Sequence, residues 1–278
     1  MSIGRRFKGT LVKGTLAFGV LAVLSNTQAL ATEFKFAVEP NYTQDKQVEV
    51  YGPLIQYLNK NTGHHFTLVT SRNFQFFWRD IRQEVPVDFM FAEGHFTDYR
   101  MQRSGFVPLV KTAEKSSFTV LANEEVAKRG INSLIGYSVV TMPSPSLGFA
   151  LLTEIFPDAI RQPNVLSSGK SWRDGVEMVF AEETDAAIVP TWLKDQYPNL
   201  IAMTTTREFP GAAVSAASSV DAAARQSVTD ALLKLHEDTT AFEVLNELGI
   251  SQFVPVTAEE YHGYDKLLKS FFGYKDAN

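Results

Sequence analysis

The stretch "VDFMFAEGHFTDY", residues 87–99, decides the fold. A short apolar run follows Asp88 directly, and it lies between two segments with helical periodicity. A run of this length and composition is typical of a strand buried on both faces of a sheet. The same plan recurs about 100 residues later as "TDAAIVPTWL", residues 184–193. The repetition predicts two lobes of similar architecture.

The flanking sequence alternates between strand and helix periodicity. In the first half, apolar residues recur with a period of two at 34–38 and with helical spacing at 51–58, and the pair repeats at 65–70 and 74–81. In the second half the corresponding segments are 137–142, 147–155, 172–180 and 184–191. Such alternation predicts an α/β protein whose mostly parallel sheets are covered by helices.

Two extended segments, 116–125 and 209–218, separate the halves and predict two crossovers between lobes. After the second crossover we expect helices at 220–236, 240–248 and 258–271 that pack back on the first lobe. The predicted lobes are therefore residues 32–118 plus 214–278, and residues 119–213. This organisation is typical of a bilobed hinge protein, in which ligands bind beyond the carboxyl ends of the strands.

Residues 1–31 have the pattern of a secretory signal peptide. Four basic residues precede the apolar segment 16–24, and Ala29-Leu30-Ala31 fits a cleavage site. The apolar segment is shorter than the roughly 20 residues that a membrane span needs. We therefore expect a mature, soluble chain that starts near Thr32 and resides in the periplasm.

Composition excludes several classes of function. The chain has 26 basic and 31 acidic residues, and because the predicted signal removes four basic ones, the mature net charge is near −9. That balance argues against nucleic acid, for which a basic face supplies much of the affinity. The chain has no cysteine, which excludes a lipid-anchoring thiol, thiol catalysis and zinc–thiolate sites.

Several segments, in this order along the chain, resemble one family. They are "FAVEP" (36–40), "YGPLIQYLNKNTG" (51–63), the two strands quoted first, and the tail "EVLNELGISQFVPVTAEEYHGYDKLLKSF" (243–271). Together they resemble the phosphate, phosphite and phosphonate substrate-binding proteins of bacterial ABC transporters. The resemblance implies a Venus-flytrap fold whose lobes close on a small, oxyanionic ligand, and delivery of that ligand by a monomer to a membrane permease.

The family's anion turn has the pattern P-x-S-T-S-G at a helix N-terminus. Residues 143–148 correspond to it and read Pro-Ser-Pro-Ser-Leu-Gly, so only Ser146 keeps its hydroxyl position. Ala212 stands where phosphonate-binding members have an acid that receives an amine, which disfavours an amine-bearing ligand. The ligand-binding residues that we expect from the resemblance and from the ends of strands are Phe74, Gly94, His95, Ser116, Ser144, Ser146, Lys170, Ser171 and Thr191.

These residues also have simpler interpretations. Ser144 and Ser146 could only cap a helix, Phe74 could be core, His95 could lie in an exposed turn, and Lys170 could be solvated. No phosphate-loop motif is present, because Asn164 stands where that motif needs glycine. The sequence predicts no metal and no cofactor.

Three other functions remain open on the sequence. A binding protein of this plan could serve a sensor kinase instead of a transporter, or could act structurally without a ligand. A periplasmic hydrolase using Glu39 and Asp185 as an acid/base pair is the third possibility. We expect a solute-binding protein that carries out no covalent chemistry.

Overall fold

The computed structural model describes residues 1–4, 32–158 and 160–277. The chain divides into two compact units, residues 1–30 and 31–278, and the second contains the features described below. The predicted signal segment falls almost wholly outside the described residues. Among the described residues, no helix is both long and apolar enough to cross a membrane.

The first sheet has six strands in the order β11-β4-β10-β3-β1-β2. They are β1 (Glu33–Val38), β2 (His65–Val69), β3 (Phe89–Ala92), β4 (Val107–Thr112), β10 (Ala213–Ala216) and β11 (Phe253–Pro255). Strand β1 is parallel to β2 and β3, whereas β10 is antiparallel to both β3 and β4. The expectation of a mostly parallel sheet was wrong, because β10 returns from the second lobe and enters the sheet in the opposite direction.

The second sheet has five strands in the order β7-β6-β8-β5-β9. They are β5 (Phe118–Ala122), β6 (Ser138–Val140), β7 (Asn164–Leu166), β8 (Ala186–Pro190) and β9 (Ile201–Thr205). This sheet is also mixed: β6 is parallel to β7 and β8, and β5 is antiparallel to β8 and β9. Both crossover segments thus contribute a strand to the lobe that they enter.

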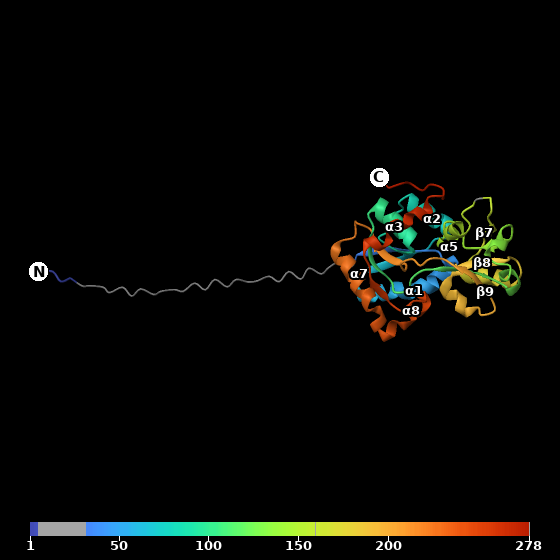
Figure 1. Ribbon diagram of the computed structural model, residues 1–278. Helices are drawn as coiled ribbons and strands as arrows, with labels where there is room; N and C mark the ends of the chain where they lie inside the picture. Colours follow the sequence, from blue (N-terminus) through green and yellow to red (C-terminus); the bar gives the residue numbers. More distant parts are fainter. Residues whose placement is uncertain (5–31, 159, 278) are drawn as a thin grey trace. The chain divides into compact units, whose positions relative to one another are not determined.

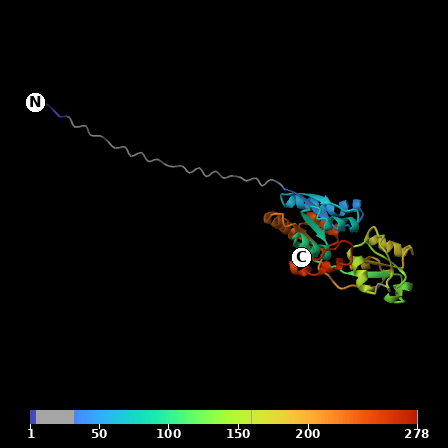
Figure 2. The ribbon, with the colours of Figure 1, turned by 90° about the horizontal axis from the view of Figure 1, so that it is seen from above.

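Helices cover both sheets, and in Figure 2 the green and yellow elements of the second lobe form a group apart from those of the first. The α-helices are α1 (Gln44–Asn61), α2 (Phe74–Arg82), α3 (Gly94–Ser104), α4 (Glu124–Ala127), α5 (Leu147–Ile155), α6 (Trp172–Phe180), α7 (Ala222–Lys234) and α8 (Phe242–Leu248). The 3₁₀ helices are η1 (Ile131–Leu134), η2 (Thr191–Gln196), η3 (Leu235–Glu237), η4 (Thr239–Ala241), η5 (Ala258–Tyr261) and η6 (Tyr264–Leu268). The single helix expected over 258–271 is wrong: Gly263, with φ 91°, interrupts the segment between η5 and η6.

Alternation along β1 divides the first lobe's core. Phe34, Phe36 and Val38 pack in a cluster with α1, α7 and α8, while Ala37 faces the other cluster with α2 and α3. That second cluster continues into the interior of the second lobe. Because strand side chains alternate between faces, one six-residue strand anchors two separate cores.

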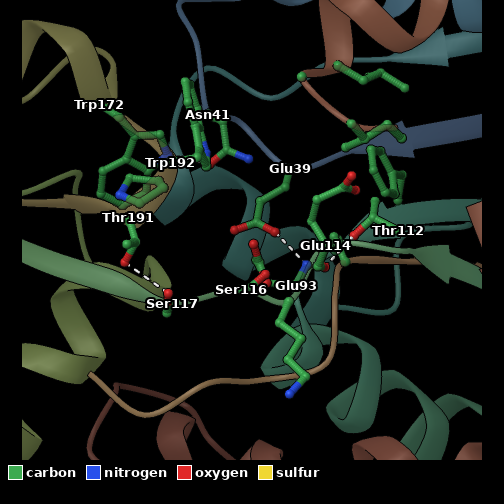
Figure 3. A pocket seen from close by; sticks show the side chains of 18 of the residues that line it. Glu39, Asn41, Glu93, Thr112, Glu114, Ser116, Ser117, Trp172, Thr191 and Trp192 are labelled. Atoms are coloured by element: carbon green, nitrogen blue, oxygen red, sulfur yellow. Dashed lines mark hydrogen bonds between the residues drawn. The ribbon is translucent and has the colours of Figure 1, made fainter. Parts of the chain in front are cut away.

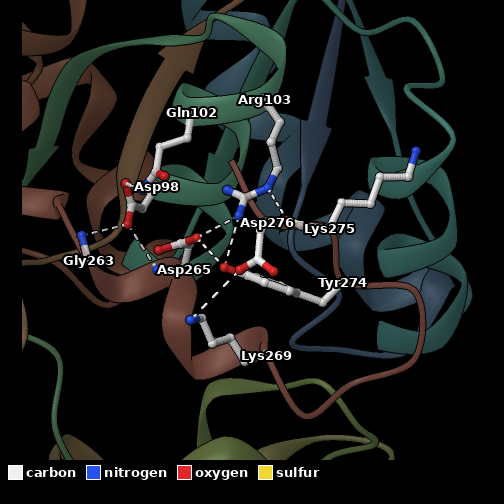
Figure 4. Close-up of polar contacts among 9 residues, drawn as sticks. All are labelled: Asp98, Gln102, Arg103, Gly263, Asp265, Lys269, Tyr274, Lys275 and Asp276. Atoms are coloured by element: carbon white, nitrogen blue, oxygen red, sulfur yellow. Dashed lines mark hydrogen bonds and ion pairs between the residues drawn. The ribbon is translucent and has the colours of Figure 1, made fainter. Parts of the chain in front are cut away.

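The C-terminal segment is fastened to α3 by a buried polar network (Figure 4). Arg103 Nη2 lies 2.8 Å from Asp265 Oδ2, with side chains only 9% and 5% exposed, and the Tyr274 hydroxyl donates to the same carboxylate. The backbone amides of Gly263 and Asp265 donate to Asp98 Oδ2 at 2.8 and 2.9 Å. Buried charges are tolerated only when they are paired in this way, so the network fixes the position of α3.

The two crossovers touch each other between the lobes. Ser116 and Phe209 form an isolated antiparallel bridge, and the Tyr261 hydroxyl donates to the carbonyl of Gly211 at 2.6 Å. A Cβ on Gly211 would overlap the carbonyl oxygens of Thr112 and Glu114, at distances that real Cβ atoms do not reach. Only glycine permits this approach of the two crossover backbones.

Candidate ligand-binding site

A cavity of about 180 Å³ lies where the two sheets meet (Figure 3). The first lobe and the crossovers contribute Glu39, Asn41, Tyr42, Val50, Tyr51, Phe91, Ala92, Glu93, Thr112, Glu114, Lys115, Ser116, Ser117, Ala212, Leu248, Gly249 and Ile250. Phe118 begins strand β5 at the end of the first crossover, and Trp172, Pro190, Thr191 and Trp192 come from the second lobe. A solute in the cavity would therefore contact both lobes.

The ends of strands position the polar lining. Glu39 follows the last residue of β1, and Glu93 follows β3, where it is the N-cap residue of α3. Thr191 and Trp192 follow β8 as the first residues of η2. Since the carboxyl ends of these strands face the cavity, the site lies where open α/β sheets place their ligands.

Two buried carboxyl groups dominate the electrostatics of the cavity. The backbone amide of Glu93 donates to Glu39 Oε2 at 2.7 Å, and Glu39 is only 3% exposed. Burial, together with the charge of Glu93, raises the pKa of Glu39 well above its ordinary value. Burial raises the pKa of Glu93 to about 7, against an opposing effect of the Ser116 hydroxyl. Oε2 of Glu93 has no hydrogen-bond partner among the described residues.

Hydrogen bonds across the cavity connect the lobes. Nε1 of Trp172 donates to Oδ1 of Asn41 at 3.0 Å, joining the start of α6 to the loop after β1. The hydroxyl of Ser117 donates to that of Thr191 at 2.9 Å, and the Thr191 amide donates to the Ser117 carbonyl at 2.8 Å. These bonds hold the first crossover against the end of β8.

Of the residues expected from the sequence, Ser116 and Thr191 line this cavity. Ser116 faces Glu93, and the Thr191 hydroxyl lies within hydrogen-bond distance of both Ser117 and Thr119. Their roles in binding a ligand stay predictions.

The turn at 143–148 lies outside the lining, and its polar groups bond within the protein. The Ser146 hydroxyl is fully buried, donates to the Met142 carbonyl and accepts from the Phe149 amide, as a helix cap does. Ser144, in contrast, is half-buried. The carbonyl of Pro145 pairs with Nε2 of His95 at 3.1 Å across the lobes.

The first turn of α3 is also enclosed by protein. Burial lowers the pKa of His95 to about 3, so its imidazole is neutral. A Cβ on Gly94 would lie 3.1 Å from the Tyr261 ring, which packs directly against this turn. Neither residue lines the cavity, although Glu93 immediately before them does.

Three further expected residues also lie outside the lining. Phe74 is fully buried and its ring stacks near that of Phe96 in the core. Lys170 is exposed, and its backbone amide donates to Asp174. Ser171 caps α6 by accepting from the Asp174 amide, and it thereby positions Trp172 at the cavity.

Sequence reasoning missed most of the polar and aromatic lining, including Asn41, Glu93, Trp172 and Trp192. Their position in the sequence could have identified two of them, because Glu93 and Trp192 each come directly or almost directly after a buried strand. Glu39 was considered only with Asp185 as a catalytic pair. Asp185 accepts from the Ser138 amide at the opposite, amino end of β8, so the two carboxyl groups are not brought together.

Among the described residues, no three His, Cys, Asp or Glu side chains are grouped so that they could hold a metal ion. The titratable groups at the cavity are instead the two buried carboxyls, the more exposed Glu114 and Lys115, and the tyrosines 42 and 51.

Comparison with known proteins relates the chain to a family. Residues 36–261 match the family model described as ABC transporter, phosphonate, periplasmic substrate-binding protein. No curated protein matches the sequence.

Solved structures share the fold at low sequence identity. PhnD1 from Prochlorococcus marinus, in complex with methylphosphonate, superposes with a TM-score of 0.72 at 12% identity, covering 85% of this chain and 97% of that one. A binding protein component of an ABC phosphonate transporter from Pseudomonas aeruginosa gives 0.69 at 12% identity, covering 85% of each. A Xanthomonas citri protein bound to ATP gives 0.65 at 14% identity, covering 84% and 95%.

Proposed function

The chain belongs to the periplasmic substrate-binding proteins of phosphonate ABC transporters, and from this premise we propose that it captures a small solute between its lobes and presents it to a membrane permease. The observation that carries the proposal is a cavity lined from both lobes at the carboxyl ends of their strands. We also propose that residues 1–31 are a cleaved signal peptide, and that the lobes are residues 32–118 plus 214–278 and residues 119–213.

Closure follows from differential affinity. A solute that contacts Glu39 and Glu93 in one lobe and Trp172 or Thr191 in the other makes all of these contacts only when the lobes are together. Binding therefore favours the closed state by the free energy of the contacts that the open state lacks. The hydrogen bond between Asn41 and Trp172 also stabilises the closed state, because it joins the two lobes directly.

The oxyanion that the resemblance implies stays a prediction, and the charges of the lining argue against it. The lining includes three glutamates and one lysine, and Lys115 is paired with Glu208 at 2.6 Å. A doubly charged anion would bind here only by keeping both buried carboxyls protonated. We therefore propose solute capture without proposing a phosphonate.

The tryptophans provide a direct test of solute capture. The chain has three, of which Trp172 and Trp192 line the cavity while Trp78 is buried in the core with its Nε1 donating to Phe272. Solute released from natively purified protein is identified by mass spectrometry and titrated back. We expect a saturable change in tryptophan fluorescence that is lost in Trp172→Phe with Trp192→Phe, and retained in Trp78→Phe.

Two results would contradict the proposal: no small solute in the native protein, or a solute whose binding leaves the cavity tryptophans unaffected. Delivery is tested separately by solute uptake in membranes containing the permease. Delivery to a sensor kinase is the alternative outcome, recognised as solute-dependent autophosphorylation without uptake.

A further inference from the structure

Resting on the proposed solute capture, we infer that the cavity selects a small organic cation with N–H donors, and that Glu39 and Glu93 receive its charged group. The sequence had instead disfavoured an amine-bearing ligand, because Ala212 stands where the resemblance implies an acid that receives an amine. Here two carboxyl groups stand at the ends of neighbouring strands β1 and β3 instead.

The first observation is a carboxyl oxygen of Glu93 that accepts no hydrogen bond from the described residues. Oε2 of Glu93 is buried at the cavity and has no hydrogen-bond partner among the described residues. A buried acceptor left unpaired costs free energy, which an N–H donor of the ligand would recover. Figure 3 shows Glu93 and Glu39 close together in the cavity, with Ser116 of the first crossover beside them.

The second observation is that groups of the chain itself already occupy part of the helix N-termini, where an anion would otherwise bind. The amino end of a helix favours negative charge, and at α3 the amide of the N-cap residue donates to the carboxyl of Glu39. At α5 the corresponding position is taken by the Ser146 hydroxyl. At α6, whose first residue Trp172 lines the cavity, the Ser171 hydroxyl accepts from the Asp174 amide. At each of these three helix ends a group of the chain itself already occupies one position where an anion would bind.

The third observation is that the two carboxyls are surrounded by neutral and aromatic side chains, with no free basic group among the described residues of the lining beside them. Tyr51, Ser116 and Tyr261 face the two carboxyls, and burial keeps both tyrosines neutral by raising the pKa of each. Lys115 lies at the cavity, but its side chain is 67% exposed and paired with Glu208. The walls are aromatic: Tyr42, Tyr51, Phe91, Phe118, Trp172 and Trp192.

Aromatic faces and carboxylates both attract cations. Burial raises the pKa of both carboxyls, and the charge of Glu93 also raises that of Glu39, so a bound cation would favour their ionised forms. Cation affinity must then rise as the pH rises through about 7, while anion affinity must fall. The sign of the pH dependence separates the two ligand classes.

The test uses probes of matched size and different charge. Propylammonium, 1-propanol and propionate are titrated against the mature protein by cavity tryptophan fluorescence, alongside methylguanidinium, methylphosphonate and phosphate. We expect binding by the two cations only, with a Kd for methylguanidinium that falls between pH 5.5 and 8.5. Methylguanidinium is chosen for the pH series because a guanidinium stays charged throughout.

Glu93→Gln keeps the shape and removes the charge. We expect it to weaken methylguanidinium binding at pH 8 by about tenfold or more, and to flatten the pH dependence. Glu183→Gln, at an exposed position of the second lobe, is the matched control and should bind as the wild type does. Circular dichroism confirms that each variant is folded, and Glu39→Gln provides an independent variant at the same pair.

The remaining outcomes decide between this inference and the proposed function. Binding of methylphosphonate or phosphate, without binding of either cation, overturns the cation site and leaves solute capture standing. Equal loss of cation binding in Glu93→Gln and Glu183→Gln also overturns it. If none of the probes binds and the natively purified protein carries no solute, both the inference and the proposed function fail.

Discussion

Replacing Glu93 by glutamine should make the protein more stable at pH 8 and leave it nearly unchanged at pH 4. The pKa of Glu93 is about 7 in the folded protein and near 4.5 in the unfolded chain. The folded state therefore holds its proton more tightly. The unfolding free energy is highest below the unfolded pKa and falls as the pH rises through the folded one.

The magnitude follows from the two pKa values. At about 1.4 kcal/mol for each tenfold difference in proton affinity, they correspond to a loss of about 3 kcal/mol between pH 4.5 and 8. Glutamine cannot ionise, so the variant avoids this loss. The pKa of Glu39 should also fall in the variant, because the charge that opposes its ionisation is gone.

Urea denaturation of the solute-free protein at half-unit pH steps from 4 to 8.5 measures this difference. We expect the curves of wild type and Glu93→Gln to diverge between about pH 4.5 and 7 and to run parallel above about pH 7.5, whereas those of wild type and the exposed control Glu183→Gln stay parallel throughout. A constant offset between wild type and Glu93→Gln across this range would refute the reasoning, since Glu93 would then titrate as it does in the unfolded chain.

Five other substitutions test the structure that surrounds the site. Gly211→Ala should lower stability by about 3 kcal/mol or more by forcing the crossovers apart, whereas Gly52→Ala, inside α1 with open space around it, should raise the melting temperature slightly; thermal unfolding compares the two. Asp265→Asn should cost about 3 kcal/mol in urea denaturation, because it leaves a buried guanidinium without its charge partner. Trp172→Phe removes the indole hydrogen bond between the lobes, and should raise the Kd of the native solute about fivefold in calorimetric titration. Ser146→Ala should lower stability by about 1 kcal/mol through loss of the helix cap without changing that Kd; a large change in Kd would place this hydroxyl at the ligand.

The architecture was largely predictable from local pattern. Alternation at Phe34, Phe36 and Val38 and the buried-type runs at 89–92 and 186–190 identified strands that the structure contains. The bilobed plan was confirmed as well, by the two separate sheets and by the fold of the related structures. Strand direction in the centre of the first sheet was predicted wrongly, because residues 213–216 reach it only after the chain has passed through the other lobe.

The site was less predictable, because it depends on how the two lobes meet. The turn at 143–148 corresponds to a family anion turn by sequence position, yet the Ser146 hydroxyl already donates to the Met142 carbonyl and accepts from the Phe149 amide. Glu39 and Glu93 are more than fifty positions apart, and only the parallel pairing of β1 with β3 brings them together. The sequence also did not indicate that burial would raise their pKa values.

The position of β10 also constrains the order in which the chain can fold. This strand lies between β3 and β4, so the centre of the first sheet stays open until residues 213–216 have been made. The tail that fastens α3 comes later still, at Asp265 and Tyr274. Neither the first lobe nor the cavity can be completed on a nascent chain. The topology of the first sheet thus delays its completion until synthesis of the chain is nearly finished.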